Sequence, residues 1–596
     1  MQEQESSRDS EIVKHVLGAP DMAPAPPLEG VPDGDGDQLP PDPLFDGVDE
    51  ELLAALALEP ANDTGNGKRL LGHFGDELLH VREIGWHGWQ GTHWEAEGGE
   101  EIATRCAQTA AARIALEAKY ITATVHERDA IEGAAKALRE LNLLNEKPQK
   151  EWTEADKDLE TALQRRITRG TIAQEAIEKR QITRRKYAVS SGNTTKIKGM
   201  LAQALPHRTV TPDDLDSDPL AFNCRNGTLR FSRELDLECP DENARRYISK
   251  VELLPHDRAD LMTKCAAVEY DPKATAPKFM KFFAEAQPSE AVRAFLQTYY
   301  GYSITGLTGE QFLIFNYGGG ANGKSVFIEM IARVIDQYAQ TLSFETIASE
   351  GAGRRGDQAT PDLARLPGAR LVRISEPKRG AVFDEALIKS LTGGEPMLVR
   401  HLHKGFFEYL PTFKMTLSGN HKPKITGGDL GIWRRMRLVP WLVTIPEDKR
   451  RAFSEVIAEF WEERSGILNW LIEGALRYLA HGITVPEEIR DATDGYREEN
   501  DYIANFMHDV LIDAPDEKVS GAEMYEAWEA WCKAQPIRPW ASNTFGTALQ
   551  AKGIKKSRPS GRSVYHGIKL NPDRPMFTRS HGGHDAPVPE DDSVPL

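Results

Sequence analysis

Four residues near the middle of the chain have the types and spacing of a phosphate-binding loop. Gly318, Gly323, Lys324 and Ser325 fit the pattern G-x-x-x-x-G-K-[ST]. In this pattern, backbone N–H groups close around phosphate oxygens at a helix N-terminus, the lysine reaches the β- and γ-phosphates, and the serine hydroxyl ligates Mg²⁺. The sequence therefore predicts that ATP binds at Gly318, Gly319, Gly320, Ala321, Asn322, Gly323, Lys324, Ser325 and Val326. The alternative is an ordinary glycine-rich loop.

The segments around this loop have the composition that its position requires. Residues 312–317 form an apolar and aromatic run that predicts a buried strand, and residues 326–332 continue as an amphipathic helix. Residues 368–376 and 413–420 indicate two more core strands. Each of these two strands ends in a polar side chain, so the loop and both strand ends are candidates for one site.

The two polar side chains that end these strands are Glu376 and Asn420. A carboxylate in the position of Glu376 can orient an attacking water or hold the water shell of a metal, so we expect Ser325 and Glu376 to serve Mg²⁺. We expect Asn420 to hydrogen-bond the γ-phosphate or the attacking water. The alternatives are a strand-end glutamate in a surface salt bridge and a turn asparagine.

A basic hairpin is predicted between the second and third strands. Lys404 and Gly405 lie at its tip, with His403 and Phe406 beside them. A cation flanked by rings suits the backbone of a single nucleic-acid strand. The predicted DNA contacts in this region are Lys389, Arg400, His403 and Lys404. The alternative is a solvated turn lysine.

Three arginines precede or lie within another apolar strand, in the segment 433–438. Arg434 or Arg435 could act as an arginine finger on the γ-phosphate of a neighbouring subunit. The remaining arginines would pair with carboxylates. The sequence does not choose between them.

The last folded segment, residues 517–570, is predicted to contain a helix at 521–534, a helix at 543–552 and a basic hairpin at 554–565. This is the order of a winged helix. The predicted phosphate contacts are Lys555, Lys556, Arg558 and Arg562. A basic hairpin that does not contact DNA is the alternative.

Composition indicates several domains between two acidic ends. A chain of 596 residues exceeds the about 250 to 300 residues at which single cores stop growing, and no apolar run approaches the roughly 20 residues of a membrane span. Residues 1–63 carry a net charge of −14 and the tail from Gly583 carries −4, so the body between them is close to neutral although the whole chain carries −18. The overall charge therefore does not exclude a nucleic-acid partner.

The segment after the acidic end is predicted to be mostly helical. Three tryptophans among glycines at 85–94 predict a small hairpin whose rings pack a core, with base stacking as the alternative. Residues 101–203 indicate helices with dense mixed charge. A solvated helical hairpin is the simpler interpretation, and contact of the basic residues at 165–166 or 184–186 with nucleic acid is the other.

The ordered motifs together resemble the phage, plasmid and poxvirus primase-helicase family, whose motor belongs to the superfamily-three helicases. The resemblance covers about residues 63 to 570. Its motifs are the tryptophan-rich start, Asn226-Gly227, Tyr270-Asp271-Pro272, residues 301–306, the glycine-rich loop, residues 391–394, Ser418-Gly419-Asn420 with Pro423, and Trp433-Arg434-Arg435. An ordered series of motifs is more specific than the loop alone.

The resemblance implies an α/β fold with a P-loop ATPase core of the superfamily-three, AAA+-like type. An N-terminal, mostly helical α+β domain and a C-terminal winged helix would flank this core. The expected boundaries are a disordered acidic tail at 1–64, the N-terminal domain at 65–275, the ATPase domain at 276–500, the winged helix at 501–570 and a disordered tail at 571–596. Many relatives carry a primase domain ahead of this region, whereas an acidic tail precedes it here, so priming activity is not expected.

The resemblance also implies the activity: a replicative DNA helicase of phage or mobile-element origin that moves on single-stranded DNA as a hexameric ring. ATP and Mg²⁺ would be its cofactors, and Lys404 would lie in the central channel. Its partners would be single-stranded and fork DNA and a primase or other replication proteins, in the cytoplasm and not at a membrane. The alternatives are a ring ATPase that remodels protein and an origin-binding initiator that uses ATP to assemble.

Overall fold

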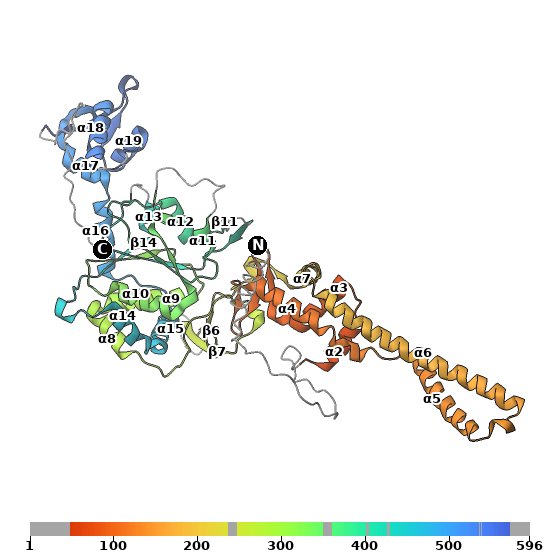
Figure 1. The fold of residues 1–596 in the computed structure, drawn as a ribbon. Helices are drawn as coiled ribbons and strands as arrows, with labels where there is room; N and C mark the ends of the chain where they lie inside the picture. The colour runs from red at the N-terminus through yellow and green to blue at the C-terminus, as the bar shows by residue number, and fades with distance from the viewer. Residues whose placement is uncertain are drawn as a thin grey trace, which may run out of the picture.

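The computed structural model describes residues 48–236, 247–349, 360–400, 405–425, 430–535, 537 and 539–572. The fold is mixed α/β with several separate sheets, as predicted. Three bodies follow one another in chain order, and a long helical arm projects from the N-terminal one (Figure 1).

The N-terminal body packs helices against a small sheet. Its helices are α2 (Glu50–Ala57), α3 (Asp63–Phe74), α4 (Gly99–Arg113) and α7 (Thr194–Arg208), and its strands β1 (Leu78–Val81), β2 (Gly85–Trp89), β3 (Trp94–Glu95) and β4 (Thr209–Val210) lie in the order β3-β2-β1-β4. Trp86 and Trp94 are buried, which agrees with the prediction that these rings pack a core. Helix α2 differs from the predicted tail at 1–64, because its Leu53 and Leu56 are buried.

The arm is an antiparallel pair of helices, α5 (Val125–Asn145) and α6 (Glu154–Ser191). Thr124 and Thr153 each cap a helix through a reciprocal capping box. The two helices approach closely at Gly170, where a Cβ atom would lie 2.2 Å from the Cβ of Ala134. The arm is anchored at its base, where the buried Glu117 binds Arg69 of α3 at 2.7 Å and Arg184 of α6.

A three-stranded antiparallel sheet connects the N-terminal and central bodies. It contains β5 (Ala221–Cys224), β6 (Gly227–Leu235) and β7 (Tyr247–Leu254). Phe222 stacks on Tyr338 of the central body with ring centroids 4.5 Å apart, and both lie in one buried core with Phe279 and Phe327. The boundary expected between 275 and 276 therefore separates residues that share a core.

The central body is built on a five-stranded parallel sheet in the order β14-β8-β13-β10-β9. These strands are β8 (Leu313–Tyr317), β9 (Ala339–Leu342), β10 (Leu371–Ile374), β13 (Lys414–Gly419) and β14 (Met436–Pro440). The strands expected at 312–317, 368–376 and 413–420 correspond to β8, β10 and β13. In these strands nearly every side chain is buried, because helices cover both faces of the sheet.

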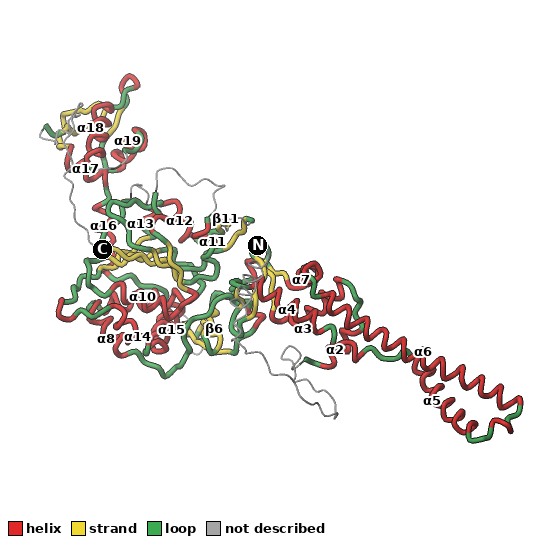
Figure 2. Tube along the Cα trace, viewed as in Figure 1, coloured by secondary structure: helices red, strands yellow, loops and turns green. Residues whose placement is uncertain are grey.

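Figure 2 shows the strands of this sheet between two layers of helices. One layer contains α8 (Pro277–Ala286), α9 (Glu290–Ile304), α10 (Lys324–Ile335), α14 (Phe453–Trp461) and α15 (Arg464–His481). The other contains α11 (Pro361–Ala364), α12 (Glu385–Gly393), α13 (Leu430–Trp433), the hairpin of β11 (Met397–Arg400) and β12 (Phe406–Tyr409), and part of α16 (Glu487–Glu499). Two separate hydrophobic cores thus hold the sheet in place.

The C-terminal body has its own core around Phe506, Trp528 and Phe545. Its elements in chain order are α17 (Tyr502–Val510), β15 (Leu511–Ser520), α18 (Gly521–Ala534), α19 (Ser542–Ala551), β16 (Lys555–Ser557) and β17 (Val564–Leu570), with the sheet order β15-β17-β16. The two expected helices and the basic hairpin are present, and α17 and β15 precede them.

Candidate functional site

The carboxyl ends of three neighbouring strands meet at one edge of the central sheet. β13 lies between β8 and β10, and all three run parallel. The chain leaves β8 into the glycine-rich loop and α10, leaves β10 toward Glu376, and leaves β13 at Asn420. The topology therefore brings Lys324, Glu376 and Asn420 together from positions up to 96 residues apart.

The Lys324 ammonium is enclosed by oxygen atoms. Its Nζ donates hydrogen bonds to the carbonyl oxygens of Gly318 at 2.7 Å and Gly319 at 3.1 Å, and to the side-chain oxygens of Asn322 at 3.2 Å and Asn420 at 3.3 Å. Only 4% of the residue is exposed. The lysine thus links the loop to the end of β13.

Burial also changes the acidity of this lysine. It lowers the pKa of Lys324 to about 8, because removal from water disfavours the ammonium, while the nearby Glu376 carboxylate acts in the opposite direction. A second negative group, such as a phosphate, would favour the charged form further.

Glu376 and Asn420 are directly joined. The backbone N–H of Asn420 donates to Oε1 of Glu376 at 2.8 Å. This bond fixes the carboxylate beside the amide side chain that contacts Lys324. A carboxylate, an amide and an ammonium in contact can together bind a phosphate group and position a water molecule next to it.

The backbone of the loop requires glycine at two positions. A Cβ at Gly318 would lie 2.2 Å from the carbonyl oxygen of Trp441, and Gly323 has a φ of +83° with Phe282 2.9 Å from its Cβ position. Gly319 and Gly320 are different, since nothing lies within 4 Å of a Cβ there. The closed side of the loop is therefore packed by the protein, and its open side faces free space.

The remaining residues of the predicted ATP site lie along the same turn. Ala321 has a φ of +56°, the side chain of Asn322 donates to the carbonyl oxygen of Gly319 at 2.6 Å, and Ser325 and Val326 belong to the first turn of α10. Ser325 is exposed. Oxygen donors of the hydroxyl and carboxylate type are those that Mg²⁺ prefers, so Ser325 and Glu376 fit the chemistry of that ion.

The structure separates the two candidate finger arginines. Arg435 is buried, and its guanidinium donates to the Thr392 hydroxyl and the Gly431 carbonyl oxygen, both at 3.1 Å. Its side chain holds α12 and α13 in place in this structure, and a catalytic role for Arg435 stays a prediction. Arg434 is exposed at the amino end of β14, the sheet edge opposite the glycine-rich loop.

The hairpin expected between the second and third strands is formed by β11 and β12. Arg400 stacks over the Phe406 ring at 4.7 Å, and Lys389 lies half-buried on α12. His403 and Lys404 lie outside the described residues. Gly405 closes the hairpin next to the N-terminal body, because its Cβ position lies 2.8 Å from Oε2 of Glu83.

The basic residues predicted at the C-terminal end lie on and between β16 and β17. Lys555, Arg558 and Arg562 are exposed, whereas the Lys556 ammonium lies over the Tyr565 ring at 5.3 Å. Three of the four predicted contacts are thus presented to solvent.

Sequence reasoning did not find Lys422, two residues after Asn420. Its ammonium lies over the rings of Tyr317 at 4.9 Å and Tyr496 at 5.6 Å and binds Glu499 at 2.6 Å. It therefore connects the end of β8 with α16, which leads to the C-terminal body. The only signal in the sequence was its proximity to Asn420.

The described residues contain neither a membrane-spanning helix nor a self-contained cluster of metal ligands. No helix there is long and apolar enough to cross a bilayer. No group of three or more His, Cys, Asp or Glu side chains there could hold a metal ion by itself.

The site and fold define a mixed α/β protein with a glycine-rich loop at the carboxyl edge of a parallel sheet. Residues 67–288 match the protein family described as D5 N terminal like, and residues 498–560 match the family described as Poxvirus D5 protein-like. The predicted resemblance to the phage, plasmid and poxvirus primase-helicase family is therefore confirmed.

Individual relatives come from viruses. The chain is 25% identical over 319 residues to "Putative helicase L207/L206" of Acanthamoeba polyphaga mimivirus and 26% identical over 299 residues to "Putative helicase 022R" of frog virus 3. These alignments cover 50% and 48% of this chain but 32% and 30% of the relatives, so the chain spans about a third of their length. "Putative primase C962R" of African swine fever virus is 21% identical over 38% of this chain and 25% of its own length.

Among solved structures, the apo C-terminal region of NrS-1 aligns with 57% of this chain and 96% of its own, at 9% identity and a TM-score of 0.32. At this TM-score the alignment does not establish a shared fold.

Proposed function

We propose that the chain is an ATP-driven motor that moves on DNA during replication. The observation that carries the proposal is the convergence of Lys324, Glu376 and Asn420 at the glycine-rich loop. In a parallel sheet flanked by helices, ligands bind at the carboxyl ends of the strands, which is where this cluster lies. The central body would accordingly be a P-loop ATPase core of the superfamily-three type.

Each residue of the cluster has a distinct role in hydrolysis. Lys324 exchanges its bonds to Gly318 and Gly319 for bonds to the β- and γ-phosphates. Asn420 hydrogen-bonds the γ-phosphate, and Glu376 orients the attacking water. Ser325 and Glu376 would hold Mg²⁺ with its water shell, and this ion, when bound, neutralises the charge that develops on the phosphate oxygens.

Assembly follows from the position of Arg434. Arg434 lies at the amino ends of the parallel strands, whereas the glycine-rich loop lies at their carboxyl ends. Arg434 is therefore far from the nucleotide of its own subunit. An exposed arginine there can reach a nucleotide on a neighbouring copy in a head-to-tail assembly, which closes into a ring when the rotation between copies allows it. We propose a hexamer for this ring.

DNA would contact the motor at two places. The first is the β11–β12 hairpin with Lys389, Arg400, His403 and Lys404, which would grip one strand in the channel. The second is the C-terminal body, which would be a winged helix; its two helices before a basic hairpin and the exposed Lys555, Arg558 and Arg562 support this. We also propose that the chain acts in the cytoplasm and that its partners are a primase or other replication proteins.

The test is the rate of ATP hydrolysis with and without single-stranded DNA, measured on the intact chain. A DNA motor hydrolyses ATP faster when single-stranded DNA is added, and Lys404→Ala should lose this stimulation while retaining basal hydrolysis. A ring that remodels protein would not respond to DNA, and an initiator would bind duplex DNA with negligible turnover. If single-stranded DNA still stimulates ATP hydrolysis in Lys404→Ala, the proposed DNA contact of the hairpin is wrong.

A further inference from the structure

Three arginines on the projecting arm form an exposed basic band. Arg165, Arg166 and Arg169 lie on adjacent turns of α6, and all three are exposed. We call them the arginine band. The surrounding residues 161–174 contain these three cations and no Asp or Glu. This stretch of α6, which lies between Glu160 and Glu175, therefore carries a net charge of +3, although the body of the chain is close to neutral.

The band differs from Arg180 and Arg184 of the same helix in its lack of carboxylate partners. Arg180 binds Glu127 through two hydrogen bonds of 2.6 and 2.7 Å, and Arg184 binds the buried Glu117. Among the described residues, no carboxylate forms an ion pair with a member of the band. Arg180 and Arg184 thus bind carboxylates of other segments of the N-terminal body and arm, whereas the arginine band is exposed to solvent.

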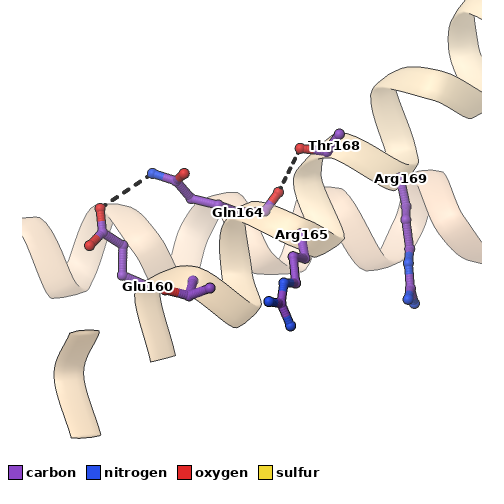
Figure 3. A pocket seen from close by; sticks show the side chains of 6 residues that line it. Glu160, Gln164, Arg165, Thr168 and Arg169 are labelled. Carbon is purple, nitrogen blue, oxygen red and sulfur yellow. Dashed lines mark hydrogen bonds between the residues drawn. The ribbon is translucent and has the colours of Figure 1, made fainter. Parts of the chain in front are cut away.

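The geometry of the band suits an extended anionic partner. Figure 3 shows Arg165 and Arg169 extending to the same side of α6, while Gln164 and Thr168 are occupied by bonds along the helix. A shallow hollow of about 430 Å³ lies beside these residues, and Glu160, whose carboxylate accepts a hydrogen bond from Gln164, also lines it. Four residues of helix separate the two Cα atoms by about 6 Å along the axis, so both guanidiniums can contact one charged surface at once.

The composition of the band distinguishes between possible nucleic-acid partners. Sites for single-stranded nucleic acid stack bases on aromatic side chains, and residues 161–174 contain no aromatic residue. Duplex DNA presents one negative charge per about 1.7 Å of its axis and needs only phosphate contacts for binding that is independent of sequence. The arm is also long enough to reach a separate duplex, because the 38 residues of α6 span about 57 Å.

We propose that the arginine band binds the phosphate backbone of duplex DNA. The inference rests on the proposed function only in taking DNA as the partner. It adds a contact for the unseparated part of a fork, distinct from the hairpin and from the C-terminal body. Binding occurs through charge-assisted hydrogen bonds from the guanidiniums to phosphate oxygens and does not depend on base sequence.

The experiment measures the affinity of the full chain for a blunt duplex as a function of salt, without nucleotide. Each lost phosphate contact reduces the slope of log affinity against log salt by about 0.9. The variant Arg165→Gln/Arg166→Gln/Arg169→Gln should therefore bind duplex more weakly and with a slope smaller by about 2 to 3. Arg165→Lys/Arg166→Lys/Arg169→Lys keeps the charge and should retain most of the slope.

A matched control removes the same charge from the far end of the arm. Lys147 and Lys157 pair with Asp156 and Glu154, and Lys150 lies in the same turn region. Lys147→Gln/Lys150→Gln/Lys157→Gln should leave the slope at the wild-type value. An unchanged slope in the arginine-to-glutamine variant, or an equal loss in the lysine control, would overturn the proposal.

Two further measurements separate this inference from the proposed function. Melting temperatures of the variants verify folding, which exposed substitutions should not affect. ATP hydrolysis without DNA should be unchanged in both glutamine variants. If the wild-type chain fails to hydrolyse ATP, the proposed function is wrong, yet the slope still decides whether the band binds duplex. A loss confined to single-stranded DNA would also contradict the duplex assignment.

Discussion

At the scale of single residues, the site depends on the charge of Lys324. Its ammonium contacts four oxygen atoms, and residues 318–326 contain no other Lys or Arg. Lys324→Ala should reduce ATP hydrolysis by about 100-fold or more, the loss typical for one preorganised charge-stabilising donor. Steady-state phosphate release measures this effect. An unchanged melting temperature serves as the control for folding, and hydrolysis at the wild-type rate would contradict the role of the lysine.

The lowered pKa of Lys324 gives the site a pH dependence. With a pKa of about 8, the free lysine loses its proton as the pH rises through 8, whereas bound phosphate favours the protonated form. Binding of a non-hydrolysable ATP analogue at pH 8.5 should therefore take up protons, and its affinity should fall above pH 8. Titration calorimetry in two buffers of different ionisation enthalpy measures the uptake.

The control for this pH effect is Lys324→Arg, which stays charged throughout the range. This variant should show less proton uptake than the wild type. Equal uptake in both proteins would assign the proton to another group.

At the scale of elements, the glycine-rich loop lies at the carboxyl ends of the parallel strands and Arg434 lies at their amino ends. If Arg434 acts on a neighbouring subunit, Arg434→Ala and Lys324→Ala should each be inactive alone. A mixture of the two should recover part of the ATPase activity, because an intact Lys324 site then meets an intact arginine. Absence of recovery after subunit exchange would show that Arg434 does not act between subunits.

Arg435 should behave differently from its neighbour. Its buried guanidinium joins Thr392 of α12 to Gly431 of α13, so Arg435→Ala leaves hydrogen-bonding groups without partners. We expect a loss of about 1–3 kcal/mol in the free energy of unfolding. Denaturant unfolding measures it, with Arg434→Ala as the neutral control. Equal stability of the two variants would contradict the structural role of Arg435.

The base of the arm depends on a buried ion-pair cluster. Glu117 and Arg69 have no exposed side-chain surface, and Arg184 shares the same carboxylate. Glu117→Ala leaves two guanidiniums buried without their partner and should cost about 3–5 kcal/mol. Glu50→Ala removes an exposed pair with Lys119 and should not change stability measurably. Similar unfolding curves for both variants would contradict this account.

Some elements of the fold are predictable from sequence, and others are not. The glycine-rich loop and the strands before Glu376 and Asn420 were predictable, because local spacing and apolar runs encode them. The burial of Arg435 was not, since it depends on Thr392, 43 residues away. The same holds for Lys422, whose partners lie on α16, and for α2, whose two buried leucines interrupt an acidic segment. Such contacts arise from packing between distant segments, which residue type alone does not specify.

At the scale of the whole molecule, the central body joins the other two through contacts of different kinds. A shared hydrophobic core joins it to the sheet of β5, β6 and β7, whereas α16 leads from it to the C-terminal body. Lys422 lies between the loop end of β8 and α16, so it links the candidate site to the helix that leads to the C-terminal body. The arm, in contrast, extends freely from the N-terminal body (Figure 1).

The central claim is that ATP hydrolysis at the loop is coupled to single-stranded DNA within a ring. The most direct test compares the hydrolysis rate of the wild-type chain with and without single-stranded DNA, on a preparation whose mass has been determined. The account predicts a hexamer whose hydrolysis is stimulated by DNA and absent in Lys324→Ala. A monomer, or a ring whose hydrolysis is indifferent to DNA, would contradict it.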